Sequence, residues 1–162
     1  MTLPFLKPPV GGETVIVEAV FKTSPERAFR AWTNEDEVVA WFGPGNSKLQ
    51  TAEIDLRVGG RWRFDYGTAD GRQDVLEGEY REIEADKRLV FTWIHTRSFR
   101  DGRVESTPAS QVTVTFTESG DSVLVRLAHE RIVTGEGRLG VSEGWSGTFV
   151  NLEAHLGARQ VE

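Results

Sequence analysis

Side chains near the end of the chain recur at the spacing of an α-helix. Within residues 141–157, VSEGWSGTFVNLEAHLG, one face of a helix would carry Trp145, Thr148, Phe149, Leu152 and Leu156. Ser142 has a residue type typical of a helix N-cap, and Gly157 one typical of a helix end. A helix of this length is marginal in water by itself. The pattern therefore predicts an amphipathic helix that lays its apolar stripe on another surface.

Two shorter helical patterns occur early in the chain. Ser24 and Pro25 are typical of an N-cap and a first helical position. Asn34 predicts a second N-cap, and Glu37, three residues later, predicts the reciprocal bond of a capping box. The segment 43–45, Gly-Pro-Gly, ends this second helix. The apolar faces of the two helices would be formed by Ala28, Phe29, Trp32, Val38, Trp41 and Phe42.

The rest of the pattern is typical of antiparallel strands. Alternation and β-branched residues predict strands at 14–21, 49–55, 60–66, 75–83, 88–96, 110–117 and 122–130. Turn sequences such as Asp70-Gly71 separate them. In the third segment Trp62, Phe64 and Tyr66 share one face, and a sheet with one apolar face needs a cover. We expect the terminal helix to supply it, after a mobile glycine-rich loop at 130–144.

Composition and charge narrow the class of protein. The chain has 162 residues, which favours a single domain at 14–160, preceded by an extended, proline-rich arm at 1–13. A net charge of −6 argues against nucleic acid and anionic membrane as partners. The absence of cysteine excludes disulfides and thiolate metal sites. With no long apolar segment in the sequence, we expect a cytoplasmic protein.

Several segments in this order resemble a known family. SPERAFRAWTNEDEVVAWFGP, EIDLRVGGRWRF, GEYREIEADKRLVFTW, VTVTFTESGDSVLVRLAHE and GWSGTFVNLEAHL are similar to the homologues of the activator of the 90-kilodalton heat-shock protein's ATPase, within the START-like (SRPBCC) superfamily. The resemblance covers roughly residues 14–157. It implies an α+β helix-grip fold, with a curved seven-stranded antiparallel sheet around a long C-terminal helix and two short helices after the first strand. It also implies a cavity between sheet and helix, and its wider group includes carriers of apolar molecules, aromatase-cyclases and co-chaperone domains.

Large aromatic side chains make up most of the candidate ligand site. Rings on the apolar face of the sheet and on the terminal helix could line a pocket for an apolar molecule, or could simply pack as core. The predicted ligand-binding residues are Trp41, Trp62, Phe64, Tyr66, Phe91, Trp93, His95, His129, Trp145, Phe149 and Leu152.

Ionisable residues offer a second kind of site. Alternation places His95 and His129 on the apolar face near strand ends, where an imidazole could act as a general acid or base, or could be a satisfied core histidine. The three histidines, including His155, have no metal-ligand spacing, so we expect neither a metal nor a cofactor. An acidic row, Glu77, Glu79, Glu82 and Glu84, is expected to form surface ion pairs, although a bulge could turn one carboxylate inward.

Three functions remain open from the sequence. The first is binding of a small, largely apolar molecule between sheet and terminal helix, gated by the segments 134–140 and 41–45. The second is a cyclase or dehydratase that uses His129 or His95 as a general acid-base. The third is a co-chaperone-like module that binds a protein partner through its surface. Pairing as a homodimer is left open with each of them.

Overall fold

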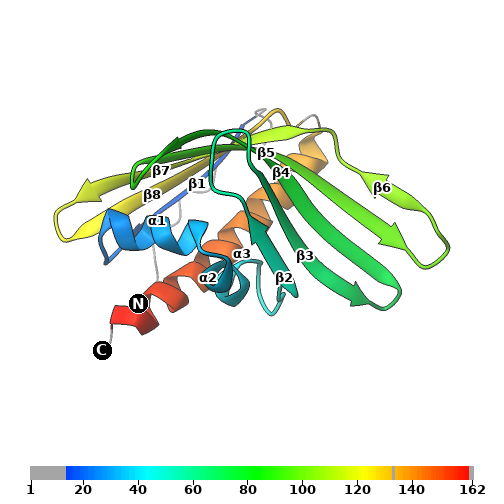
Figure 1. Ribbon diagram of the computed structural model, residues 1–162, viewed down its shortest axis with the longest axis horizontal. Helices are drawn as coiled ribbons and strands as arrows, with labels where there is room; N and C mark the ends of the chain where they lie inside the picture. The colour runs from blue at the N-terminus through cyan, green and yellow to red at the C-terminus, as the bar shows by residue number, and fades with distance from the viewer. Residues whose placement is uncertain (1–13, 133, 161–162) are drawn as a thin grey trace.

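The computed structural model describes residues 14–132 and 134–160, and the predicted arm at 1–13 lies outside them. The described chain forms one antiparallel sheet and three helices (Figure 1). The strands are β1 (Val15–Phe21), β2 (Thr51–Ile54), β3 (Arg61–Ala69), β4 (Arg72–Glu84), β5 (Arg88–Phe99), β6 (Val104–Ser106), β7 (Ser110–Ser119) and β8 (Ser122–Glu130). The helices are α1 (Pro25–Thr33), α2 (Glu35–Trp41) and α3 (Gly135–Gln160).

The sheet has the order β1-β8-β7-β5-β4-β3-β2, with β6 paired to β5. All seven predicted strands are present, and β6 is an eighth that the sequence pattern did not indicate. Figure 1 shows α3 running across one face of the curved sheet, with α1 and α2 on that same side. The predicted helix-grip architecture is therefore confirmed.

Both short helices begin at the predicted caps. The Ser24 side chain accepts from the backbone N–H of Arg27 at 3.1 Å, and the Asn34 side chain accepts from the backbone N–H of Glu37 at 3.1 Å. The prediction of a reciprocal capping-box bond from Asn34 to Glu37 is wrong. The Asn34 N–H donates to the Arg30 carbonyl, and the Glu37 carboxylate pairs with Arg27 instead. Helix propensity and capping chemistry thus act locally, while the Glu37 side chain follows tertiary contacts.

The terminal helix is longer than its pattern predicts at both ends. It begins at Gly135, and the Thr134 hydroxyl accepts from the backbone N–H of Gly137 at 2.9 Å, as an N-cap does. The predicted N-cap Ser142, the loop at 130–144 and the gate at 134–140 are therefore wrong, since most of these residues are helical. The predicted stop at Gly157 is also wrong, because the helix continues to Gln160. Tertiary packing holds these glycines in a helix that their own propensity disfavours.

The predicted stripe on α3 is the face that packs on the sheet. Its five residues are at most 3% exposed: Trp145, Thr148, Phe149, Leu152 and Leu156. On the sheet side the core contains the predicted inward face of β3 together with inward residues of β1, β7 and β8. The prediction that α3 is amphipathic is confirmed. The part of the sheet that α3 covers lies under the middle and C-terminal part of this helix.

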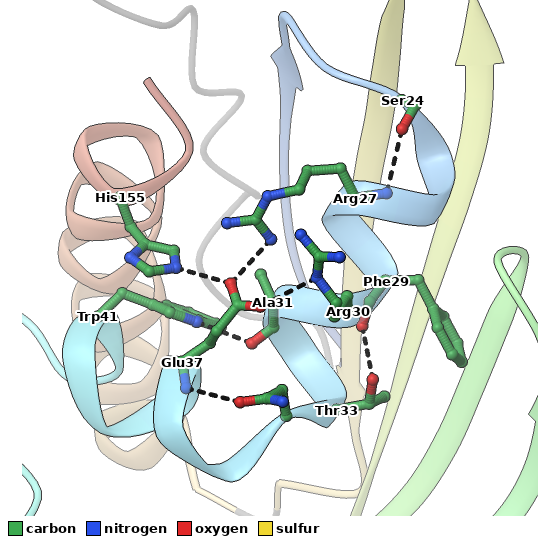
Figure 2. Close-up of polar contacts among 10 residues, drawn as sticks. Ser24, Arg27, Phe29, Arg30, Ala31, Thr33, Glu37, Trp41 and His155 are labelled. Carbon is green, nitrogen blue, oxygen red and sulfur yellow. Dashed lines mark hydrogen bonds and ion pairs between the residues drawn. The ribbon is translucent and has the colours of Figure 1, made fainter. Parts of the chain in front are cut away.

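A buried ionic cluster joins the three helices (Figure 2). The Glu37 carboxylate, on α2, lies 2.7 Å from an Arg27 Nη and 3.2 Å from the Arg30 Nε on α1, and 2.9 Å from the His155 Nε2 on α3. The Glu37 side chain is only 7% exposed. Burial alone would raise the pKa of Glu37, but the hydrogen bonds from His155 and Arg27 outweigh it and the net pKa is lowered. The cluster therefore fixes the C-terminal half of α3 against α1 and α2.

The sheet extends past its packed core on one side. β3 and β4 continue to a two-residue turn at Asp70 and Gly71, whose φ angles of 55° and 75° are those of a tight hairpin turn. β5 runs on to Phe99 and pairs there with β6. The predicted strands stop earlier because these ends carry mostly polar residues. Backbone pairing continues them, together with cross-strand side-chain bonds such as that of Asp74 with Arg97. This extension forms one wall of the candidate site.

Candidate functional site

Aromatic rings fill most of the space between the sheet and the helices. The ring centroids of Trp62 and Phe64 are 4.8 Å apart, and those of Trp32 and Trp41 are 5.0 Å apart. A void of only about 20 Å³ is left, roughly the space of one water. Its lining is Trp32, Val38, Trp41, Phe42, Trp62, Phe64, Tyr80, Leu89, Phe91 and Trp93. The interior at this point is therefore a packed core and not a ligand cavity.

An open cleft of about 510 Å³ lies next to that core. The first part of α3 forms one wall, β3, β4 and β5 form the other, and the corner after α2 closes one end. Its lining is Phe42, Pro44, Ser47, Tyr66, Arg72, Asp74, Leu76, Trp93, His95, Arg97, Thr107, Gly137, Gly140, Val141, Gly144, Trp145 and Thr148. The volume falls within the range of small-molecule sites.

The structure separates the predicted ligand-binding residues into three groups. Those that line the cleft are Tyr66, Trp93, His95 and Trp145. Those that line the small interior void are Trp41, Trp62, Phe64 and Phe91, and Trp93 reaches both spaces. Those that are fully buried and line neither space are His129, Phe149 and Leu152. Only the first group is within reach of a molecule in the cleft.

Half of the α3 residues that border the cleft are glycines. Gly137, Gly140 and Gly144 lie there, and a Cβ built on Gly140 or Gly144 would meet no atom within 4 Å. Bare backbone of this kind lets another group approach a helix closely. By contrast, a Cβ on Gly147 would lie 2.8 Å from the Pro44 Cβ. The glycines of one helix thus have two different uses.

The corner at residues 43–45 is fastened to α3. The Asn151 side-chain amide donates to the Gly43 carbonyl at 2.6 Å and to the Gly45 carbonyl at 3.0 Å. The positive φ angles of Gly43 and Gly45, 110° and 60°, bring both carbonyls toward that amide. This corner was predicted as part of a gate. Its two hydrogen bonds and the close packing of Pro44 on Gly147 make it a fixed end wall of the cleft.

Charged groups gather where the cleft meets the extended strands. Asp74 lies directly opposite Arg97 in the β4–β5 pair, and its Oδ1 accepts from the Arg97 Nε at 2.8 Å and the His95 Nε2 at 2.9 Å. The Arg72 Nε lies 3.2 Å from its Oδ2. Burial alone would raise the pKa of Asp74, but the hydrogen bonds from Arg97 and His95 leave it lowered. Asp74 therefore stays ionised and orients three donors.

Tyr66 stands beside this charged group on a β-bulge. The register of β3 and β4 shifts between Asp65 and Thr68, and the Asp65 carboxylate accepts from the Gly67 N–H at 2.7 Å within that bulge. Burial, followed by the charge of Asp74, raises the pKa of Tyr66 to about 12. The phenol is therefore a neutral hydrogen-bond donor at the cleft wall at neutral pH.

His129 lies behind the cleft in a closed chain of hydrogen bonds. The Trp145 indole N–H donates to its Nδ1 at 3.1 Å, so the proton of a neutral ring is on Nε2, which faces the Ser110 hydroxyl at 2.7 Å. Ser110 in turn donates to the Trp93 carbonyl at 3.3 Å. Burial lowers the pKa of His129 to about 3, and the residue is 0% exposed. Its two nitrogens are occupied by the protein, whereas His95 is the histidine that faces the cleft.

Sequence reasoning missed the charged residues of the cleft. Asp74 precedes the predicted strand 75–83, although it has the same parity as the inward residues Leu76 and Tyr80. Arg97 follows His95 by two residues on β5 and was missed in the same way. Extending both predicted strands by one or two residues would have found them. The acidic row, in contrast, forms the expected ion pairs on the surface, with Arg61, Arg81, Lys87 and Arg88 as partners.

Within residues 14–132 and 134–160, no group of three or more His, Asp or Glu side chains is arranged to hold a metal ion. None of the described helices has both the length and the apolar character needed to cross a membrane.

A curved antiparallel sheet that grips a C-terminal helix, with an apolar cleft beside that helix, defines a helix-grip protein of the START-like class. Residues 22–157 match the family described as Activator of Hsp90 ATPase homolog 1-like protein. The chain therefore belongs to this family.

Solved structures of similar proteins share this fold. A protein from Rhodobacter sphaeroides superposes with a TM-score of 0.77 at 18% identity, covering 96% of this chain and 99% of that one. The AHSA1 protein from Silicibacter pomeroyi gives 0.75 at 21% identity, covering 90% and 99%. DynU16, a protein in the dynemicin biosynthetic locus, gives 0.70 at 22% identity, covering 90% of this chain and 47% of that one. A search of curated protein sequences found no match. At these identities the likeness shows the fold alone.

Proposed function

We propose that the protein binds a small, largely apolar molecule in the cleft between the first part of α3 and strands β3 to β5. The observation that carries this proposal is the cleft itself, with a volume of about 510 Å³ and a lining in which apolar side chains are joined by bare helix backbone. Aromatic rings beside a few polar groups are typical of small-molecule sites. The binding site lies beside the packed core, and we expect the protein to act in the cytoplasm.

A calorimetric titration with a neutral apolar probe, 2-naphthylmethanol, tests the proposal. We expect saturable binding of one probe per chain. Gly144→Leu puts a large side chain into the cleft and should abolish binding without unfolding the protein. Gly157→Leu is the matched control, because it is the same change on the same helix, with open space at its Cβ and no place in the cleft lining. Absence of saturable binding, or equal binding by both variants, would overturn the proposal.

Acid-base catalysis in the same cleft is the second candidate function. The observation that favours it is the His95–Asp74 contact of 2.9 Å at the cleft wall, since a carboxylate that orients an imidazole is a common arrangement for a general base. His129 is not available for this role. Exchange of the α-hydrogens of 2-tetralone in D₂O, followed by NMR, would detect proton abstraction next to a carbonyl. We expect exchange that is lost in His95→Gln while 2-naphthylmethanol binding is kept; exchange at the uncatalysed rate with wild-type protein would exclude this chemistry for such ketones.

A chaperone partner and a homodimer stay predictions. The large apolar side chains exposed in the described residues are scattered: Val20, Leu56, Val58, Val104, Leu139 and Val150. Scattered apolar residues of this kind are ordinary on a protein surface. Small-molecule binding in the cleft is therefore the function that the geometry supports best.

A further inference from the structure

The polar end of the cleft offers more hydrogen-bond donors than acceptors. Arg72 and Arg97 each direct Nε at the Asp74 carboxylate. Among the described residues, their remaining guanidinium N–H groups have no hydrogen-bond partner, and neither has the Tyr66 hydroxyl. The Asp74 oxygens already accept from both arginines and from His95. A molecule in the cleft would therefore meet unpaired donors at this end and an acceptor that is already occupied.

The charge at this end is opposite to the charge of the chain. Two guanidinium groups face one carboxylate in the cleft lining, whereas the whole chain carries a net charge of −6. An adjoining groove of about 710 Å³ shares Tyr66, Arg72 and Asp74 with the cleft and has a cationic excess of its own. Its further charged residues are Lys48, Arg100 and Arg103 against Asp70 and Asp101. Local positive potential in an acidic protein draws an anion to this place.

The other end of the cleft is apolar. Gly140 and Gly144 expose helix backbone there, and the half-buried Trp93 supplies a ring surface beside it. Trp145 also borders the cleft, although it is only 3% exposed. Such a floor suits a planar or extended apolar body. The cleft thus joins a site for an apolar body to a site for an anionic group within one molecule's reach.

Building on the proposed function, we propose that the natural ligand is an amphipathic carboxylic acid, with its apolar body on the glycine and tryptophan floor and its carboxylate on Arg72, Arg97 and Tyr66. A planar guanidinium fork matches a carboxylate in both geometry and charge. The phenol of Tyr66 adds a neutral donor. Asp74 acts as a positioning residue that holds the two guanidinium groups in place before the ligand binds.

Three probes with the same ring system but different charges test this inference. Calorimetric titrations with 2-naphthoate, 2-naphthylmethanol and 2-naphthylmethylammonium compare an anion, a neutral molecule and a cation of similar size. We expect 2-naphthoate to bind about tenfold more tightly than the alcohol, as a charge-assisted hydrogen bond provides. The ammonium probe should bind most weakly, and added salt should weaken only the naphthoate.

Two arginine variants test whether the preference for 2-naphthoate over 2-naphthylmethanol arises at the polar end of the cleft. Arg72→Gln should bring the affinity of 2-naphthoate close to that of 2-naphthylmethanol, so that the ratio of the two affinities in the variant falls toward one. Arg61→Gln changes the net charge equally at a surface position outside the cleft, and it should leave the preference intact. Equal binding of anion and alcohol, or a preference that survives Arg72→Gln, would overturn the inference while the proposed function stands. Absence of binding by all three probes would overturn both.

Discussion

The glycines of α3 provide the sharpest test of how this helix is built. Gly144 lies at the cleft, and a Cβ there meets no atom within 4 Å. A glycine inside a helix costs about 0.8–1.0 kcal/mol relative to alanine. Because a new methyl group at this position meets no steric barrier, Gly144→Ala should raise the free energy of unfolding by about 1 kcal/mol. For a chain of this size that corresponds to a rise in Tm of roughly 2–4 °C.

Gly147, one turn further along, should respond in the opposite direction. It gains the same helix propensity, but its new Cβ would lie 2.8 Å from the Pro44 Cβ and 3.3 Å from the Pro44 Cα. Overpacking of this kind costs about 1–3 kcal/mol. The Pro44 corner cannot easily withdraw, because Asn151 holds the carbonyls of Gly43 and Gly45. Gly147→Ala should therefore lower stability by up to about 2 kcal/mol after the propensity gain is subtracted.

Thermal and urea unfolding followed by circular dichroism would measure both variants under the same conditions. Helix content should be unchanged in each. A lower Tm for Gly144→Ala, or an equal rise for both variants, would refute the assignment of one glycine to open space and the other to a close contact. Binding of 2-naphthylmethanol adds a second measurement, because the Gly144 methyl group occupies cleft volume and should weaken binding as it stabilises the fold.

Three further predictions concern the core. Glu37→Gln should cost about 3 kcal/mol in urea unfolding, because it leaves the buried Arg27 charge without its partner. Because the pKa of Glu37 is lowered, its contribution to stability is fully present above 4.5, the usual pKa of a glutamate, and is lost as pH falls through the folded pKa. The variant should therefore lose less stability than wild type on acidification. The His129 pKa of about 3 predicts that the His129 imidazole does not titrate by NMR between pH 5 and 8. Stability should fall as pH drops below 6.5, the usual pKa of histidine, since only the unfolded chain takes up the proton there. A titration of His129 near neutrality would contradict the hydrogen-bond chain. Gly78→Ala should prevent stable folding in a purification and circular dichroism test, because its Cβ would lie 1.9 Å from the Thr92 carbonyl oxygen.

Periodicity was sufficient to predict the parts of the fold that depend on burial. Every residue of the predicted stripe on α3 is buried, and the inward face of β3 follows the alternation of Trp62, Phe64 and Tyr66. Capping chemistry was equally local, so Ser24 and Asn34 cap α1 and α2 as expected. These features could be read from sequence because each is decided by a residue and its near neighbours.

Features that depend on distant contacts could not be read in this way. The first turns of α3 are rich in glycine, yet the Thr134 cap, a bond of 2.9 Å from Arg138 to the Ile132 carbonyl and the contact of Trp145 with His129 hold them helical. Which rings pack and which face open space depends on how side chains from β3, β4, β5 and the three helices meet. The pattern placed Trp62 and Trp93 on one face, but only the structure shows that Trp62 is in the core and that Trp93 reaches the cleft.

The position of the cleft follows from where the two layers cease to match. β3, β4 and β5 extend beyond the region that α3 can cover with side chains, and the part of α3 above them carries glycine. Apolar surface on the half-buried Trp93 is therefore left facing a gap, with the buried Trp145 at its edge. His129 then has a structural role. It accepts from the Trp145 indole and so orients that ring, and through Ser110 it connects to the Trp93 backbone. The Trp93 and His129 ring centroids are 5.2 Å apart, so the imidazole also packs against the Trp93 ring. A rigid apolar floor beside preorganised donors lowers the free-energy cost of ordering the site when a ligand binds. Such preorganisation is expected of a binding site and is not required of a gap left by incomplete packing.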